Sequence, residues 1–396
     1  MKKFFIGVVV SIVALTNVFA DNGLSQEKLF NATIKEVDMG GVSLQYQKLE
    51  NLEAAVLSLI ELSMMSDKQA ALNPMAQVQL ALAMNSLKGM VKKANLNAIQ
   101  SVAASIKNVN DNTYLNKAFI YTGNQPTGLL YDIMGRENKG FNYLKIVPED
   151  AVFACTAHVD MGLVYNALYN GVLKNNPMVA QYIPLLEMQF GMPLADFMKT
   201  LSGEYVSFVT TAITETGVSA QYLIRIPDNA GNLSNFLKMV LGTQEAVVQL
   251  PANQQNPNIA PVIVFAEKSI IVATNKLAIA QSMEAENSGK NILTNANFAP
   301  YREYIQNNGL SQCFVALDQT QMQLLNSLLV ASDVNYSFKP AFAIIETQVT
   351  EDGYKVVMPS SFNLASPADI LATKAALMKM VSANAEKLKK LKDMAK

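Results

Sequence analysis

The chain has 396 residues, of which 50% are hydrophobic and only 16% are charged, against about 25% charged residues in an average globular protein. With 31 Lys and Arg against 32 Asp and Glu, the net charge of −1 excludes a nucleic-acid-binding protein that relies on a basic excess. One histidine and two cysteines cannot supply the three or four ligands of an ordinary zinc site, so we expect neither a metal nor a cofactor.

Residues 1–20 have the pattern of an export signal. Lys2 and Lys3 precede an apolar run from Phe4 to Leu15, and a small residue, Ala20, ends a typical cleavage site. This run is shorter than the roughly 18–20 apolar residues that span a bilayer, and no later run is long enough. We therefore predict a periplasmic or secreted protein with no transmembrane segment after cleavage.

Two segments, 205–226 and 341–358, are predicted to form similar β-hairpins. Both turn through Thr-Glu-x-Gly, where Gly217 and Gly353 would supply the positive φ that tight turns require. A weaker third copy spans 101–121 and turns through an Asn-rich stretch. The strand face with Phe208 and Thr210 is not strongly apolar, so we expect one side of the sheet to be solvated or covered by a partner.

A strand followed by a helix recurs in the same units. Residues 151–160 precede a helix over 161–173, and residues 311–318 precede a helix over 319–331, with a fainter match at 41–62. Asp160 and Asp318 occupy the N-cap position of the first two helices, where a carboxylate accepts hydrogen bonds from free backbone amides. Further helices are predicted over 233–241 and 277–286, and a second hairpin over 262–274.

The last predicted helix begins at Ser366, a serine cap that is followed by proline. Lysines from Lys387 to Lys396 give this helix a basic end, which suits the helix dipole and alternatively fits an interfacial membrane helix. Its apolar stripe has helical spacing and consists of Ile370, Leu371, Leu377, Met378, Val381, Ala385, Leu388, Leu391 and Met394.

The predicted fold class is α+β, with duplicated antiparallel hairpin sheets and helices packed on one face. After the signal at 1–20, a helix-rich unit that ends in a hairpin spans 21–146. A central α+β unit spans 147–305. A C-terminal α+β unit with the terminal amphipathic helix spans 306–396.

Short motifs recur at 114–121, at 128–135 and at 147–153, where a Pro-Glu-Asp-Ala lead enters a strand, and the helix capped by Asp160 follows. In these motifs the chain resembles a family of exported bacterial proteins known only as a domain of unknown function, over about residues 100–345. The resemblance implies a duplicated α+β architecture and a location in a Gram-negative envelope. It implies no catalytic or binding residue.

Cys155 and Cys313 are 158 residues apart, as are Asp160 and Asp318, so the cysteines occupy equivalent positions in two copies of the unit. In an oxidising compartment they could form a disulfide if the equivalent strands are neighbours. Two separate buried thiols are the alternative.

Catalytic patterns are weak throughout the sequence. His158 lies three residues from Cys155, which places the two on opposite faces of a strand and disfavours a catalytic pair. No nucleophile elbow, Walker loop or dinucleotide-binding motif occurs. The many methionines suit gap-filling core packing better than Cu(I) binding.

We therefore expect an exported protein that is not an enzyme and that binds an envelope partner or has a structural role. The alternative is a periplasmic carrier of an apolar ligand such as lipid, and a hydrolase is the weakest hypothesis. A deep cavity would favour the carrier, whereas a filled core with an exposed apolar patch would favour partner binding.

Overall fold

The structure, a computed structural model, describes residues 26–65, 85, 87–123, 127–169, 174, 177–214, 217–252, 259–319, 322–323 and 339–362. The predicted export signal and the predicted helix that begins at Ser366 lie outside these ranges.

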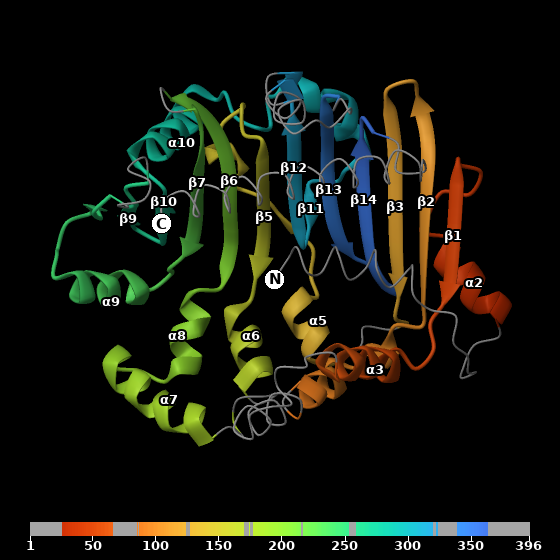
Figure 1. Cartoon of the computed structure of the whole chain (residues 1–396), viewed down its shortest axis with the longest axis horizontal. Coiled ribbons are helices and arrows are strands. Elements are labelled where there is room, and N and C mark those ends of the chain that lie inside the picture. The colour runs from red at the N-terminus through yellow and green to blue at the C-terminus, as the bar shows by residue number, and fades with distance from the viewer. Residues whose placement is uncertain are drawn as a thin grey trace, which may run out of the picture.

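One antiparallel sheet of twelve strands dominates the described residues (Figure 1). The mixed α+β class is therefore confirmed, and strands from all three predicted units pair in this single sheet. In spatial order the strands are β1 (Ser43–Lys48), β2 (Ser101–Asn110), β3 (Thr113–Tyr121), β14 (Gly353–Ser360), β13 (Ala341–Val349), β12 (Ser311–Leu317), β5 (Phe153–Val159), β6 (Gly203–Thr214), β7 (Gly217–Pro227), β10 (Ser269–Ala273), β9 (Val262–Ala266) and β8 (Val247–Gln249).

The strand order shows the path of the chain through the sheet. It begins at one edge with β1, β2 and β3, crosses to build the other half from β5 to β10, and returns to the middle with β12, β13 and β14. The two halves meet where β12 pairs with β5. This pairing is non-local, because β5 and β12 are far apart in the sequence.

Helices pack on both faces of the sheet. On one face, here called the packed face, α10 (Lys276–Ser288) and the 3₁₀ segments η3 (Leu144–Ile146) and η5 (Ala296–Tyr304) cover a core that includes Phe208, Phe314 and Ile344. On the same face, α2 (Gln26–Ile34) packs on β2 and β3 in a second cluster that includes Phe119. Two short strands, β4 (Lys139–Gly140) and β11 (Asn308–Gly309), pair with each other.

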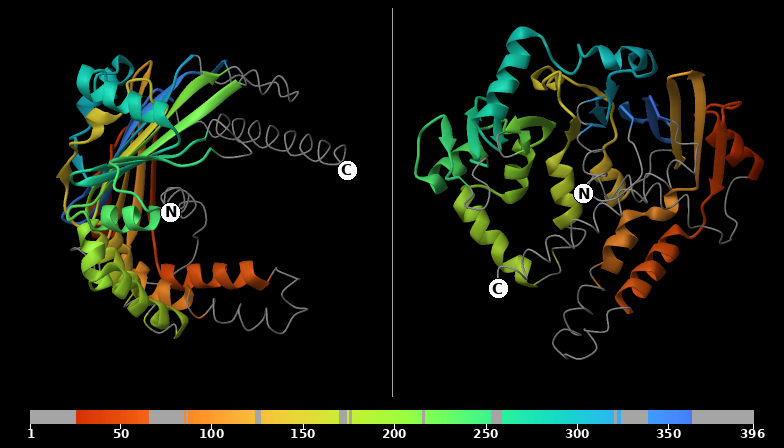
Figure 2. Two further views of the ribbon diagram at one scale, coloured as in Figure 1. Left: turned by 90° about the vertical axis from the view of Figure 1, so that its left-hand side faces the viewer. Right: turned by 45° about the horizontal axis from the view of Figure 1, so that its top comes forward.

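The other face carries both cysteines and is here called the disulfide face. There α9 (Asn232–Leu241) packs on β9 and β10, while α3 (Leu52–Met65) and α5 (Leu129–Met134) pack against Val102 of β2 and Tyr354 of β14. Figure 2 shows α10 on one side of the sheet and α3 projecting on the other. The prediction that helices cover one face alone is wrong, because the apolar ends of the outer strands need cover on the second face too.

Three helices, α6 (Met161–Leu168), α7 (Pro177–Phe190) and α8 (Leu194–Thr200), connect β5 to β6 at one end of the sheet (Figure 1). They form a small separate cluster around Leu194, Phe197 and Leu201. In the described part of the chain, no helix is long and apolar enough to cross a membrane.

Candidate binding surface

Alternate side chains of the six central strands, from β7 to β14, form three rows on the disulfide face, here called the central rows. No side chain in these rows is charged. The rows consist of Tyr222, Val209, Phe153, Val315, Ala343 and Ser360; of Ile224, Ser207, Cys155, Cys313, Ile345 and Met358; and of Ile226, Tyr205, Ala157, Ser311, Thr347 and Val356.

Large apolar side chains in the central rows are open to solvent. Phe153 and Ile224 are each 40% exposed, and the neighbouring Tyr222 is 54% exposed. Val209 and Val315 are half-buried, whereas four members of the rows are buried, namely Cys155, Ala157, Ala343 and Ser360. Because contiguous exposed apolar surface on a folded protein marks an interaction site, the central rows are the candidate binding surface.

The partly solvated face is not the one that the sequence suggested. Phe208 and Thr210 lie in the packed core, where they are 1% and 0% exposed. Thr210 is tolerated there because its hydroxyl donates a hydrogen bond to the side-chain oxygen of Gln281 on α10, at 3.0 Å. Their neighbours Tyr205 and Val209 point to the disulfide face instead, because successive side chains on a strand alternate between faces.

A disulfide joins Cys155 to Cys313 in the middle of the central rows. The two residues are direct partners in the pairing of β5 with β12, and their Cα atoms are 4.0 Å apart. The alternative of two separate thiols therefore does not hold in this structure. The bond leaves no free cysteine among the described residues.

The predicted helix caps have different outcomes. Asp160 caps α6, because its side chain accepts a hydrogen bond of 2.9 Å from the amide of Leu163. Asp318 follows β12 directly, but most of the helix predicted after it lies outside the described residues. Ser366 also lies outside them.

The prediction that Gly353 supplies a positive φ for a tight turn is wrong. Gly353 begins β14 and has no positive φ; a Cβ atom there would lie 2.0 Å from the carbonyl oxygen of Ile120 on β3. Glycine is required by the close approach of two strands, not by the turn. Gly217 begins β7, and the turn residues before it, 215 and 216, lie outside the described residues.

Glu346 is a fully buried carboxylate in the centre of the packed face. It accepts hydrogen bonds from the backbone amides of Gln306 and Asn307, at 2.9 and 2.8 Å, and from the side chains of Gln312 and Gln348. These hydrogen bonds hold the segment before β11 onto the sheet.

Glu204 has the same role at the other half of the packed face. Its carboxylate accepts hydrogen bonds from the amides of Asn142 and Tyr143, at 2.9 and 3.0 Å, and from the hydroxyl of Thr156. Arg225 stacks on the Tyr143 ring, and burial lowers the pKa of this arginine. Both glutamates therefore hold the segments that contain β4 and β11.

His158 has a structural environment. Its Nε2 atom lies 2.9 Å from the carbonyl oxygen of Gly140, and its ring stacks on Phe141. It points to the packed face, so the strand separates it from Cys155. The structure thus agrees with the interpretation of His158 as a strand residue.

One surface depression, lined mainly by polar residues, is open to solvent. It has a volume of about 520 Å³ and lies between the segment of Pro148 to Asp150 and the helix α10. Burial raises the pKa of Asp150 there. Among the described residues, no group of three or more His, Cys, Asp or Glu side chains could hold a metal ion.

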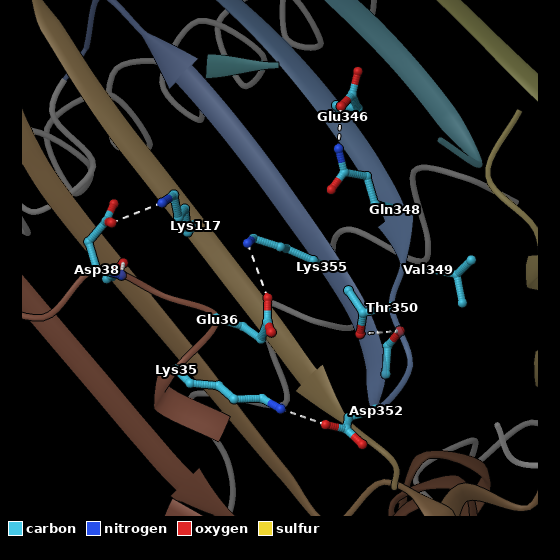
Figure 3. A network of polar contacts seen from close by, with 12 residues as sticks. Lys35, Glu36, Asp38, Lys117, Glu346, Gln348, Val349, Thr350, Asp352 and Lys355 are labelled. Carbon is cyan, nitrogen blue, oxygen red and sulfur yellow. Dashed lines mark hydrogen bonds and ion pairs between the residues drawn. The ribbon is translucent and has the colours of Figure 1, made fainter. Parts of the chain in front are cut away.

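Ion pairs fasten the segment after α2 to the edge of the packed face (Figure 3). The hydrogen bond with Asp352 raises the pKa of Lys35. The three pairs are Lys35–Asp352 at 2.7 Å, Lys355–Glu36 at 3.2 Å and Lys117–Asp38 at 2.8 Å. Each of the three charged residues of this short segment is paired with an opposite charge, so we interpret the segment as a structural contact, not a ligand site.

No family model, curated protein or solved structure matches this chain. The resemblance to an exported bacterial family thus stays an expectation.

Proposed function

We propose that this chain is an exported, non-catalytic envelope protein that binds an apolar segment of a partner protein on the central rows. The observation that carries the proposal is the combination of Phe153, Tyr222 and Ile224, all exposed in rows that contain no charged side chain. The core below the opposite face consists of packed apolar side chains, and its two central glutamates accept hydrogen bonds from protein groups. A filled core with an exposed apolar patch favours partner binding over the carrying of a ligand.

We further propose that the sheet is an internal duplication, as the sequence repeats indicate. The supporting observation is that β5, β6 and β7 run outward on one side of the Cys155–Cys313 pair, while β12, β13 and β14 run outward on the other. The disulfide favours an oxidising compartment such as the periplasm.

Photo-cross-linking tests the proposed function. With the photoreactive residue p-benzoylphenylalanine in place of Tyr222, we expect irradiation of intact envelopes to give one discrete protein adduct. The matched control places the same residue at Met283, which is 59% exposed on α10 at the packed face and should give no such adduct. Identical adducts at both positions would contradict the proposal, and lipid adducts alone would favour the carrier.

A further inference from the structure

We propose that two copies of this chain associate through the outer side of α7, with the two α7 helices antiparallel about a twofold axis at Leu185. This inference goes beyond the proposed function, because it concerns a second surface, at the end of the sheet where α6, α7 and α8 lie (Figure 1). It depends on the exposure of α7, on the order of its side chains and on their chemistry.

One side of α7 is covered by the neighbouring helix. Ile183 and Phe190 pack against α8, where the Phe190 ring stacks on Phe197 with the ring centroids 4.0 Å apart. Glu187 lies on this side too, and its carboxylate accepts a hydrogen bond of 2.9 Å from the amide of Leu194. Because Glu187 is the one charged residue of α7, the rest of the helix carries no charge.

The opposite side of α7 is open to solvent and mainly apolar. Tyr182, Leu185 and Met188 are 61%, 51% and 75% exposed. Gln181 and Gln189 flank them and are also exposed. A helix that is apolar on all sides is normally buried on all sides, so we expect a partner to cover this stripe of five residues.

The order of these five side chains is symmetrical about Leu185. Tyr182 and Met188 lie three residues before and after it, and Gln181 and Gln189 lie four residues before and after it. Positions three and four apart share one side of an α-helix. When two such helices pack antiparallel about a twofold axis, Leu185 meets Leu185 of the second copy. Tyr182 of each copy then meets Met188 of the other, and Gln181 meets Gln189.

The pairs formed in this arrangement are chemically complementary. A glutamine amide both donates and accepts hydrogen bonds, so Gln181 and Gln189 can bond to each other across the axis. The Met188 sulfur can lie against the Tyr182 ring, which is a favourable contact. The symmetry of the stripe therefore gives each side chain a suitable partner in a second copy.

A second copy fits this side of α7 better than a lipid surface does. Helices that lie in a membrane interface are rich in lysine and arginine on their polar side, and α7 contains neither residue. A lipid surface would also leave Gln181 and Gln189 without the matching amides that a second copy supplies.

Analytical ultracentrifugation of the purified full-length chain tests the association. An interface of one helix pair is small, so we expect a monomer–dimer equilibrium with a dissociation constant in roughly the micromolar range. Leu185→Asp should raise this constant about tenfold or more, because it places two carboxylates against each other on the axis. Met283→Asp is the matched control, at a position that is 59% exposed on α10, and should leave the constant unchanged. A chain that stays monomeric, or equal constants in the two variants, would overturn the inference.

Introduced cysteines test the geometry of the pair. Both native cysteines form the disulfide, so an introduced thiol is the only free one in the chain. Leu185→Cys should give a disulfide-linked dimer under mild oxidation, because this position meets its own copy. Tyr182→Cys and Met188→Cys should form a linked dimer when the two variants are mixed, and much less of it when each is alone. Equal linkage of Tyr182→Cys alone and in the mixture would rule out the antiparallel arrangement.

Vesicles of phosphatidylcholine and phosphatidylglycerol test the other occupant. We expect Leu185→Asp to leave the flotation of the chain with these vesicles unchanged. A wild type that is monomeric without vesicles, and whose flotation is lost in Leu185→Asp, would assign α7 to lipid and overturn the inference. These measurements do not involve the central rows, so their failure would leave the proposed function standing.

Discussion

Cys155 on β5 and Cys313 on β12 lie directly opposite each other, so a single disulfide joins the two halves of the sheet across a sequence separation of 158 residues. All the strands from β5 to β10 lie within the loop that this bond closes. The bond therefore restricts the unfolded state of that entire half.

Removal of the disulfide should lower stability substantially. For Cys155→Ala with Cys313→Ala, we expect the free energy of unfolding to fall by about 3–5 kcal/mol, because closure of a long loop no longer limits the unfolded chain. Urea unfolding followed by circular dichroism measures this change. Ser207→Ala, beside Cys155 in the same row, is the control and should cost less than about 1 kcal/mol. Equal stability of the double variant and the wild type would contradict this account.

Replacement of Glu346 by glutamine should lower the free energy of unfolding, although the two side chains have the same shape. In Glu346→Gln, an amide group replaces one carboxylate oxygen and faces donors, so at least one of the backbone amides of Gln306 and Asn307 loses its partner. We expect a loss of about 2–4 kcal/mol in unfolding free energy, and faster hydrogen exchange at these two amides. Glu351→Gln, on an exposed turn, is the matched control and should change neither quantity. The same exchange rates in both variants would show that Glu346 does not hold the segment.

Deprotonation of Tyr205 should lower the free energy of unfolding at alkaline pH. Burial raises the pKa of Tyr205 to about 12, and its hydroxyl donates a hydrogen bond to the carbonyl of Leu201 at 2.8 Å. The pKa of Tyr205 in the folded state exceeds the unfolded value of about 10. The protonated hydroxyl therefore contributes fully to the free energy of unfolding below pH 10, and this contribution is lost as the pH rises to about 12.

Two pKa units correspond to at most about 2.7 kcal/mol, and partial solvent exposure of the tyrosine reduces our expectation to about 1 kcal/mol. Urea unfolding at pH 9 and pH 11.5 measures the decline. Tyr205→Phe should remove this part of it, whereas Tyr222→Phe, in the adjacent strand, should not. If both variants keep the full decline, another group causes it.

The N-terminal helix should be held by apolar contacts more than by its ion pairs. Leu29 of α2 is 3% exposed and packs in a cluster with Phe119, whereas the Lys35–Asp352 pair is near the surface. Leu29→Ala should cost about 2–4 kcal/mol, and Lys35→Met less than about 0.5 kcal/mol. Thermal unfolding in low and high salt measures both, and a large salt effect on the wild type would contradict the ranking.

The sequence predicted those features that depend on neighbouring residues. Both hairpins and the Asp160 cap are local, because a turn or a first helical turn needs only a few residues in the right order. For Cys155 and Cys313 the sequence left two alternatives open, a disulfide or two separate buried thiols.

The order of strands could not be predicted, because β14 pairs with β3 through contacts more than 200 residues apart. Glu346 resembled any solvated acid in the sequence, since three of its four donors, Gln306, Asn307 and Gln312, are distant from it in the chain. The candidate surface was missed for a related reason: which side of β6 meets solvent depends on where α10 packs, and α10 is distant in sequence.

The close approach of β14 to β3 gives the last prediction. A methyl group at Gly353 would lie 2.0 Å from the carbonyl oxygen of Ile120, and the backbone cannot shift without disturbing the pairing of β14 with β3. Gly353→Ala should therefore cost about 2–3 kcal/mol, as overpacking does. Gly140→Ala is the matched control, because a methyl group there meets nothing within 4 Å and the residue has no positive φ. Urea unfolding should show almost no change for this control, and equal losses in the two variants would mean that the two strands can separate locally to admit a side chain.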